Sequence, residues 1–214
     1  MRDIVVYVEG PSDARALEAL LRTTVDQASK AGTLIRFIPA DDKKNLMLQV
    51  PRRAARMLAN DPAKVVVALP DLYPPNVGGA HETFDQLHRV LTSHLEKELQ
   101  REGNDDSRVR ERFRIHCFQY DLEVLLLANP NALGARLGRH ELPVSWRLPL
   151  EEQNHHNPPK RIVEALFREH GSRYNGKIDA PAILAGCDAD AIARALPLRF
   201  KPFLDDLRQW AEVP

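Results

Sequence analysis

Ile4-Val5-Val6-Tyr7-Val8-Glu9-Gly10-Pro11-Ser12-Asp13 is the stretch that decides the fold, because it combines a strand, a turn and the start of a helix. Its apolar part is typical of a buried β-strand, and the Gly-Pro pair that follows indicates a tight turn. A helix is expected to begin near Ser12. Because ligands bind at the carboxyl ends of the strands in an open α/β sheet, Glu9 lies where chemistry is expected.

Two further apolar runs also lead into acidic residues. Residues 64–69 are followed by Pro70 and Asp71, and residues 113–118 lead into Asp121 and Glu123. The carboxyl ends of parallel strands meet at one edge of a sheet, so these carboxylates are expected to converge with Glu9. Carboxylate oxygens are hard ligands, which predicts a divalent cation, Mg²⁺ first and Mn²⁺ as the alternative.

The composition is that of an ordinary globular protein. Hydrophobic residues make up 43% of the 214 residues, and no apolar run approaches the roughly 20 residues that span a bilayer. Met1-Arg2-Asp3 leads directly into strand-like sequence, which predicts a cytoplasmic protein without a membrane anchor. Lys plus Arg and Asp plus Glu both number 30, so the zero net charge disfavours a simple DNA-coating role but not a local basic groove.

Strand and helix patterns alternate over the first part of the chain. Strands are predicted at 3–9, 34–38, 64–69 and 113–118, and helices at 13–30, 46–58, 81–100 and 121–127, with a kink or restart at Pro51. This alternation predicts an α/β domain over residues 1–130, with a mostly parallel four-stranded sheet flanked by helices. We expect residues 131–214 to form a helical C-terminal extension, with helices at 161–169, 188–195 and 202–210.

The order of these motifs resembles that of a known group of proteins. Val8-Glu9-Gly10, with Asp13 three residues later, is similar to the first motif of Toprim domains, the metal-dependent catalytic domains of topoisomerases, primases and certain nucleases. Over nearly its whole length the chain resembles the DUF4276 family of Toprim-like proteins. The motifs that carry this resemblance are Glu9-Gly10, Asp71-Leu72-Tyr73-Pro74, Asp121-Leu122-Glu123-Val124-Leu125-Leu126, Pro159-Lys160-Arg161-Ile162, Tyr174, Lys177 and the segment from Phe200 to Leu204.

The resemblance implies a Toprim-like fold and gives roles to the acids. It implies that Glu9 transfers protons and binds metal, and that Asp71, Asp121 and Glu123 are further metal ligands. Toprim enzymes usually carry Asp-x-Asp at the second motif, where this chain has Asp71 and Tyr73, so one expected carboxylate is missing. The acids of the third motif are expected to supply the missing ligand.

Several other residues have a functional and a structural interpretation. Asp13 is either a metal or outer ligand or the helix-start acid that follows an N-cap at Ser12. Tyr73 is expected to pack or hydrogen-bond over the site. Basic residues that either bind phosphate or lie in solvated segments are Lys43, Lys44, Lys160, Arg161 and Lys177.

These observations predict a Mg²⁺-dependent nuclease that cleaves phosphodiester bonds of nucleic acid at the acidic edge of the sheet. Bacterial defence against phage or mobile DNA, with a protein partner in a defence complex, is the setting that the analogy implies. The zero net charge and Tyr73 at the second motif favour an alternative, a non-catalytic binding module of a larger complex. A third hypothesis is a metal-dependent enzyme that acts on small nucleotides, which a narrow acidic pocket without a basic groove would favour.

Overall fold

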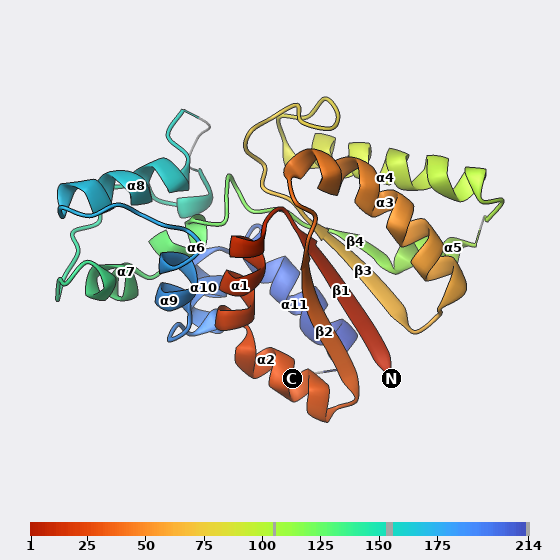
Figure 1. The fold of residues 1–214 in the computed structure, drawn as a ribbon, viewed down its shortest axis with the longest axis horizontal. Helices are drawn as coiled ribbons and strands as arrows, with labels where there is room; N and C mark the ends of the chain where they lie inside the picture. The colour runs from red at the N-terminus through yellow and green to blue at the C-terminus, as the bar shows by residue number, and fades with distance from the viewer. Residues whose placement is uncertain (105, 153–155, 213–214) are drawn as a thin grey trace.

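A computed structural model of the chain describes residues 1–104, 106–152 and 156–212. In the described residues, four strands form a sheet in the order β2-β1-β3-β4, and every strand pair is parallel. The strands are β1 (Arg2–Val8), β2 (Thr33–Pro39), β3 (Lys64–Leu69) and β4 (Phe113–Ile115). The predicted α/β class is confirmed, and the sheet is fully parallel where we expected a mostly parallel one (Figure 1).

The strands divide the apolar core into two layers. Ile4, Val6 and Val8 of β1 belong to one buried cluster, and Val5 and Tyr7 belong to the other. Strand β3 divides in the same way, because successive side chains of a strand point to opposite faces. Helices cover both faces, which is why the central strands read as continuous apolar runs.

One face of the sheet is covered by α3 (Lys43–Asn60) and α4 (Phe84–Arg101). Helix α3 continues through Pro51 without the restart that the sequence allowed. A proline has no N–H to donate to the carbonyl four residues earlier, which here belongs to Met47. The ring Nδ1 of His94 in α4 lies 2.9 Å from that carbonyl oxygen and replaces the missing donor.

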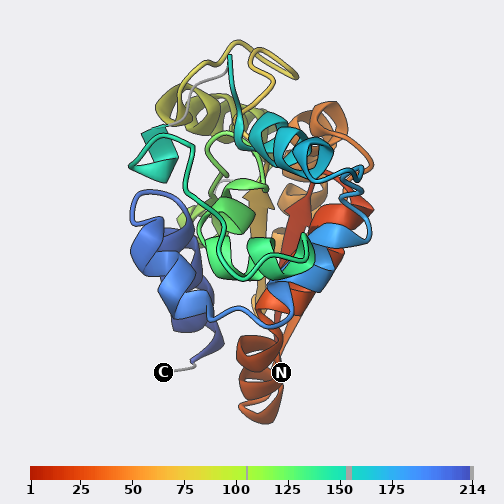
Figure 2. The ribbon, with the colours of Figure 1, turned by 90° about the vertical axis from the view of Figure 1, so that its left-hand side faces the viewer.

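The other face is covered by α1 (Pro11–Leu20) and α2 (Arg22–Lys30) together with helices from the C-terminal part of the chain. The elements that follow α4 are α5 (Ser107–Glu111), α6 (Val124–Leu127), α7 (Pro130–Arg136), a 3-10 turn at Leu150–Glu152, α8 (Pro159–Glu169), α9 (Asp179–Leu184), α10 (Ala189–Ala195) and α11 (Phe200–Ala211). Helix α9 packs against α1, and α11 packs against β1, β2 and α2. Figure 2 shows these C-terminal helices, coloured green to blue, in front of the sheet.

The C-terminal part is therefore helical, as expected, and it completes a core that it shares with the sheet. The boundary near residue 130 stays a prediction. Helices α7 and α9 are absent from the sequence prediction. None of the helices in the described part of the chain is both long and apolar enough to span a membrane.

Two helix predictions are wrong at their boundaries. The helix expected over residues 13–30 is interrupted at Leu21, where α1 ends and α2 begins. The helix expected from residue 81 begins at Phe84, because the Thr83 hydroxyl accepts a hydrogen bond from the N–H of Gln86 and caps the helix there.

Two further boundaries near the site also differ from the prediction. The strand expected over residues 113–118 ends at Ile115, and the helix expected from residue 121 begins at Val124. Backbone bonding to the second motif continues past the strand, because the N–H of Leu72 donates to the carbonyl of Phe118 at 2.9 Å. The two acids of the third motif, Asp121 and Glu123, therefore lie in a turn between β4 and α6.

Candidate acidic metal centre

The strand order places Glu9 and Asp71 side by side. Strands β1 and β3 are neighbours, and each acid follows the carboxyl end of its strand. The backbone N–H of Asp71 donates a 3.0 Å hydrogen bond to Oε1 of Glu9. Both residues keep part of their surface open to solvent. Parallel pairing thus brings these two predicted metal ligands to one accessible edge.

Asp13 reaches the same edge through the turn that follows β1. Its Oδ2 accepts a 2.8 Å hydrogen bond from the N–H of Gly10, at the start of α1. The carboxylate therefore has the helix-start role that the sequence offered and fixes the turn next to Glu9, but the N-cap is Gly10 and not Ser12 as predicted. Its charge also acts on Asp71.

Asp121 and Glu123 lie in the turn before α6, where helical spacing does not force their side chains apart. They are 4% and 7% exposed, respectively. Both carboxylate oxygens of Asp121 lie within hydrogen-bonding distance, 3.1 and 3.2 Å, of the N–H of Lys160. The carboxylate of Asp121 therefore caps the first turn of α8. Oε1 of Glu123 accepts a 3.1 Å hydrogen bond from the hydroxyl of Tyr174. The C-terminal helices therefore contact the acidic edge directly.

Asp71 is the centre of this group. Desolvation by the surrounding protein raises the pKa of Asp71 well above its ordinary value, and the charges of Glu9, Asp13, Asp121 and Glu123 raise it further. Like charges held close together disfavour ionisation of one another. We call these five residues the acidic centre.

Desolvation raises the pKa of the other four acids as well. It raises the pKa of Glu9 to about 7, although the charge of Lys43 acts in the opposite direction. The charge of Glu123 adds to the raised pKa of Asp121. A carboxyl group with a pKa near 7 can release and accept a proton at neutral pH, which suits general acid–base chemistry.

The ammonium group of Lys43 is bonded to backbone carbonyl oxygens inside the protein. Lys43 is 5% exposed, and its Nζ donates to the carbonyl oxygens of Leu72 at 3.0 Å and Pro74 at 2.7 Å. These bonds tie the segment after β3 to the first turn of α3. The same segment approaches α3 so closely that a Cβ on Gly78 would lie 2.5 Å from Cβ of Met47. In this arrangement Lys43 anchors the segment and does not present a free ammonium group to a substrate.

Lys160 is the predicted phosphate-binding residue that the structure brings to the acidic centre. The charge of Glu123 is the main cause of the raised pKa of Lys160, and Glu164, Asp121 and Asp71 add to it. Its ammonium group is therefore charged at neutral pH, and its side chain is not buried. Lys160 serves the site twice, because its backbone N–H also holds Asp121.

The donor set of the acidic centre suits a hard divalent cation. Every group is a carboxylate, and a cation would offset the mutual repulsion that raises the pKa values. As the side chains lie, no three His, Cys, Asp or Glu residues within 1–104, 106–152 and 156–212 are arranged to hold a metal ion. Binding therefore requires side chains to turn, and Asp71 is free to do so because its carboxylate accepts no hydrogen bond from the described residues.

The other predicted residues lie at the margin of the site. The N–H of Tyr73 donates to the carbonyl of Tyr120 at 2.8 Å, which joins the second and third motifs. The guanidinium of Arg161 donates to the carbonyl of His156 at 2.9 Å. Lys44 and Lys177 are exposed. Their binding of phosphate stays a prediction.

Tyr174 is one of the motif residues, but its place in the motif pattern did not predict a role for it. Its hydroxyl contacts Glu123, and its ring packs edge-on against Phe167 with centroids 5.2 Å apart. Burial raises the pKa of Tyr174, so the hydroxyl remains a neutral donor at physiological pH. It lies 51 residues from Glu123 in sequence, and only its place in the motif pattern pointed to it.

Comparisons with known proteins agree with the motif pattern. The model of a protein family described as "Domain of unknown function (DUF4276)" matches residues 8–208, so the chain belongs to this family. A comparison with curated protein sequences gives no match. Among solved structures, the C-terminal region of the OLD protein of Xanthomonas campestris pv. campestris is 16% identical, with a TM-score of 0.49 over 98% of this chain and 96% of that one. The C-terminal region of the Burkholderia pseudomallei OLD protein is 15% identical, with a TM-score of 0.47 over 97% of this chain and 99% of that one.

Proposed function

We propose that this member of the DUF4276 family is a Toprim-like, Mg²⁺-dependent nuclease that cleaves phosphodiester bonds of nucleic acid at the acidic centre. The observation that carries the proposal is the convergence of five acids with raised pKa values on one edge of a parallel sheet. Such perturbed groups concentrate at functional sites, where they are arranged for chemistry rather than for stability.

Glu9, Asp71 and Glu123 are the residues proposed to hold Mg²⁺, or Mn²⁺ in its place. Asp121 belongs to the predicted ligand set, and its bond to the N–H of Lys160 makes it the acid that positions α8 beside the metal. Bound Mg²⁺ would supply charge neutralisation of the phosphodiester and a lowered pKa for an attacking water.

The remaining chemistry belongs to side chains of the chain itself. Glu9 is the residue proposed to transfer a proton to the leaving oxygen, and in the metal-free protein its pKa is raised to about 7. The ammonium group of Lys160 offers a positive charge to a phosphate oxygen. Tyr174 keeps Glu123 oriented through its hydroxyl, and Lys43 holds the segment after β3 in place. This division leaves the carboxylates of Glu9 and Asp71 facing the solvent-accessible edge.

The proposal is tested by incubating the protein with single-stranded and duplex DNA and RNA, in Mg²⁺, Mn²⁺ or EDTA. We expect metal-dependent cleavage that falls by at least about 10²–10⁴-fold in Glu9→Gln, the range that a general acid or base contributes. Asp71→Asn is expected to lose cleavage completely. Asp26→Asn is the matched control, because Asp26 is an exposed acid on α2, away from the acidic centre.

Retention of full cleavage by both Glu9→Gln and Asp71→Asn would contradict the assignment of the acidic centre. A wild-type protein that cleaves none of the four polymers in either metal would contradict the nuclease itself. Cleavage by wild type and Asp26→Asn, but not by Glu9→Gln or Asp71→Asn, would support both the nuclease activity and the assignment of the acidic centre. Melting temperatures of all variants are needed to exclude loss of fold.

A second function is favoured by two observations. The acids in the described ranges are not arranged to hold a metal as they lie, and the second motif has Tyr73 in place of an acid. Both facts suit a non-catalytic Toprim-like module that binds nucleic acid or a protein partner, for example in a bacterial defence complex. The cleavage assay and calorimetry together separate the two functions, because a non-catalytic module would cleave none of the polymers even if calorimetry shows that it binds Mg²⁺.

A further inference from the structure

A cavity of about 440 Å³ adjoins the acidic centre on the side of α8. It is lined by Glu164 and Arg168 of α8 and by Ser172, Arg173 and Tyr174 from the segment that follows. Tyr174 forms a wall between the cavity and the acidic centre, because its hydroxyl contacts Glu123 at 3.1 Å. Any ligand in this cavity would therefore lie next to the proposed site of cleavage.

Two arginines of this cavity are not engaged by acids. Arg168 and Arg173 are exposed, and neither has a carboxylate within ion-pair distance among the described residues. Other arginines do have such partners, as Arg136 does at Asp179, 2.7 Å away, and Arg208 does at Asp190, 2.6 Å away. The cavity therefore presents two free guanidinium groups.

One carboxylate also lines the cavity. Glu164 acts on Lys160, one turn earlier on α8, and contributes to its raised pKa. The three charged residues Lys160, Glu164 and Arg168 are spaced by four and lie on one face of the helix. Among Lys160, Glu164, Arg168 and Arg173, three side chains are therefore positive and one is negative.

The helix fixes the distance between the two ends of this charged face. Lys160 and Arg168 are eight residues apart, which corresponds to about 12 Å along an α-helix. Duplex nucleic acid advances about 3.4 Å per nucleotide along its axis, and the phosphates also wind around that axis, so a straight distance of this length spans about two nucleotides. The spacing matches a polymer whose backbone runs from the acidic centre along α8.

We infer that Arg168 and Arg173 bind a backbone phosphate of a polynucleotide about two nucleotides from the bond that is cleaved. The position relative to the cleaved bond rests on the proposed nuclease function, whereas the binding itself does not. Guanidinium groups suit this ligand because their donors match phosphate oxygens in a bidentate arrangement. The subsite selects polymers over small nucleotides, because a mononucleotide at the acidic centre does not reach it.

Binding is measured by fluorescence anisotropy with labelled single-stranded and duplex oligonucleotides of about two to about 20 nucleotides, over a series of salt concentrations. The full-length protein carries Glu9→Gln so that no cleavage interferes. In this background, Arg168→Gln/Arg173→Gln is compared with Arg22→Gln/Lys30→Gln, which removes two exposed charges from α2. Arg168→Lys/Arg173→Lys shows how much of the effect requires charge alone.

We expect Arg168→Gln/Arg173→Gln to weaken binding of the longer oligonucleotides about tenfold or more at low salt. The slope of log affinity against log salt should fall by about 0.7 for single strands and 0.9 for duplexes, since the loss of one phosphate contact removes that amount. The lysine variant should recover most of the slope. Oligonucleotides too short to reach the subsite should show a smaller difference between variant and control.

An unchanged salt slope in Arg168→Gln/Arg173→Gln, or a change that Arg22→Gln/Lys30→Gln shares, would overturn the inference. So would the absence of polymer binding by the parent protein, or equally strong competition by poly-glutamate, which would indicate an acidic peptide as the ligand. A reduced slope in a protein whose wild type never cleaves would support the subsite and contradict only the nuclease.

Discussion

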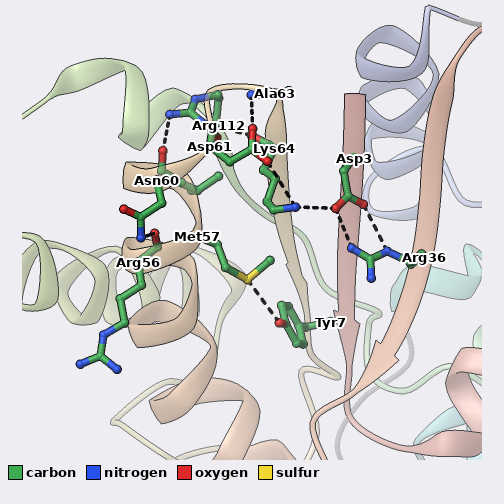
Figure 3. A network of polar contacts seen from close by, with 11 residues as sticks. Asp3, Tyr7, Arg36, Arg56, Met57, Asn60, Asp61, Ala63, Lys64 and Arg112 are labelled. Atoms are coloured by element: carbon green, nitrogen blue, oxygen red, sulfur yellow. Dashed lines mark hydrogen bonds and ion pairs between the residues drawn. The ribbon is translucent and has the colours of Figure 1, made fainter. Parts of the chain in front are cut away.

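Acidic side chains at the two ends of the sheet have neighbours of opposite charge. At the amino end, Asp3 of β1 accepts hydrogen bonds from Arg36 of β2 at 2.6 and 3.2 Å and from Lys64 of β3 at 2.8 Å (Figure 3). Although burial acts to raise it, these partners hold the pKa of Asp3 below its ordinary value. At the carboxyl end, Asp71 has acids for neighbours, and its pKa is raised.

The contrast separates a structural charge from a functional one. Figure 3 shows Asp3 between two cations on neighbouring strands, where it stabilises the edge of the sheet. The acidic centre has fewer cations than acids, since its five carboxyl groups interact with Lys43, which also bonds to carbonyl oxygens, and with Lys160. Repulsion of this kind costs folding stability, and proteins retain such costs where function requires them.

The largest expected effect is on metal-linked stability. Asp71→Asn removes the acid on which the other four act, so it should stabilise the metal-free protein by about 1–2 kcal/mol. Wild-type protein should gain about 2.7 kcal/mol from Mg²⁺ at 100 times its dissociation constant, and the variant should gain little. Urea unfolding at pH 7.5 in EDTA and in Mg²⁺ measures both changes. If Asp71→Asn is less stable than wild type in EDTA, repulsion within the acidic centre does not destabilise the metal-free protein, and the contrast between the two ends of the sheet is wrong.

At the amino end of the sheet, removing an acid is expected to lower the stability of the protein instead of raising it. Asp3→Asn removes the shared acceptor of Arg36 and Lys64, so it should lower the free energy of unfolding by about 2 kcal/mol, a typical loss for hydrogen bonds to charged groups. Mg²⁺ should not restore this loss. The measurement is the same urea titration, and an unchanged midpoint would show that the network of Figure 3 contributes nothing to stability.

The pH dependence of stability should also differ between the two ends. Glu9 has a raised folded pKa, so in EDTA its protonation favours folding, and stability should rise as the pH falls from about 7 towards 4.5. Glu9 should contribute on the order of 1–2 kcal/mol to this gain. Glu9→Gln should lack that part and keep the part that comes from the raised pKa values of the other four acids. Asp3 has a lowered pKa, so its contribution is present above its ordinary pKa of 3.8 and is lost as the pH falls below it. Thermal melts in EDTA from pH 8 to pH 3 test both directions.

The smallest expected effect concerns the helix cap at the site. Asp121→Ala leaves the N–H of Lys160 without its acceptor and should cost about 1 kcal/mol, as loss of a helix cap does. Asp121→Asn keeps an acceptor and should cost less. If Asp121 is instead needed only as a metal ligand, both variants will melt like wild type in EDTA and differ from it only in Mg²⁺.

Much of the sheet and part of the site were predictable from local sequence. The apolar run before Glu9 and the run before Asp71 each indicate a strand and the residue at its carboxyl end, and parallel pairing then implies that the two acids meet. The cap of α8 was not predictable, because Asp121 and its partner Lys160 are 39 residues apart. The capping box at Thr83 and Gln86 was visible in the sequence and would have corrected the start of α4.

The sequence by itself determined the parallel α/β sheet and the acids at its carboxyl edge, because burial on both faces and position at a strand end are local properties. Only the tertiary structure decided which charges are paired. It placed Asp3 between two cations, buried Lys43 against backbone carbonyls and brought Tyr174 to Glu123. Desolvation and Coulomb interactions depend on distances in space, so the pKa values that distinguish the two edges follow from packing between segments far apart in the chain.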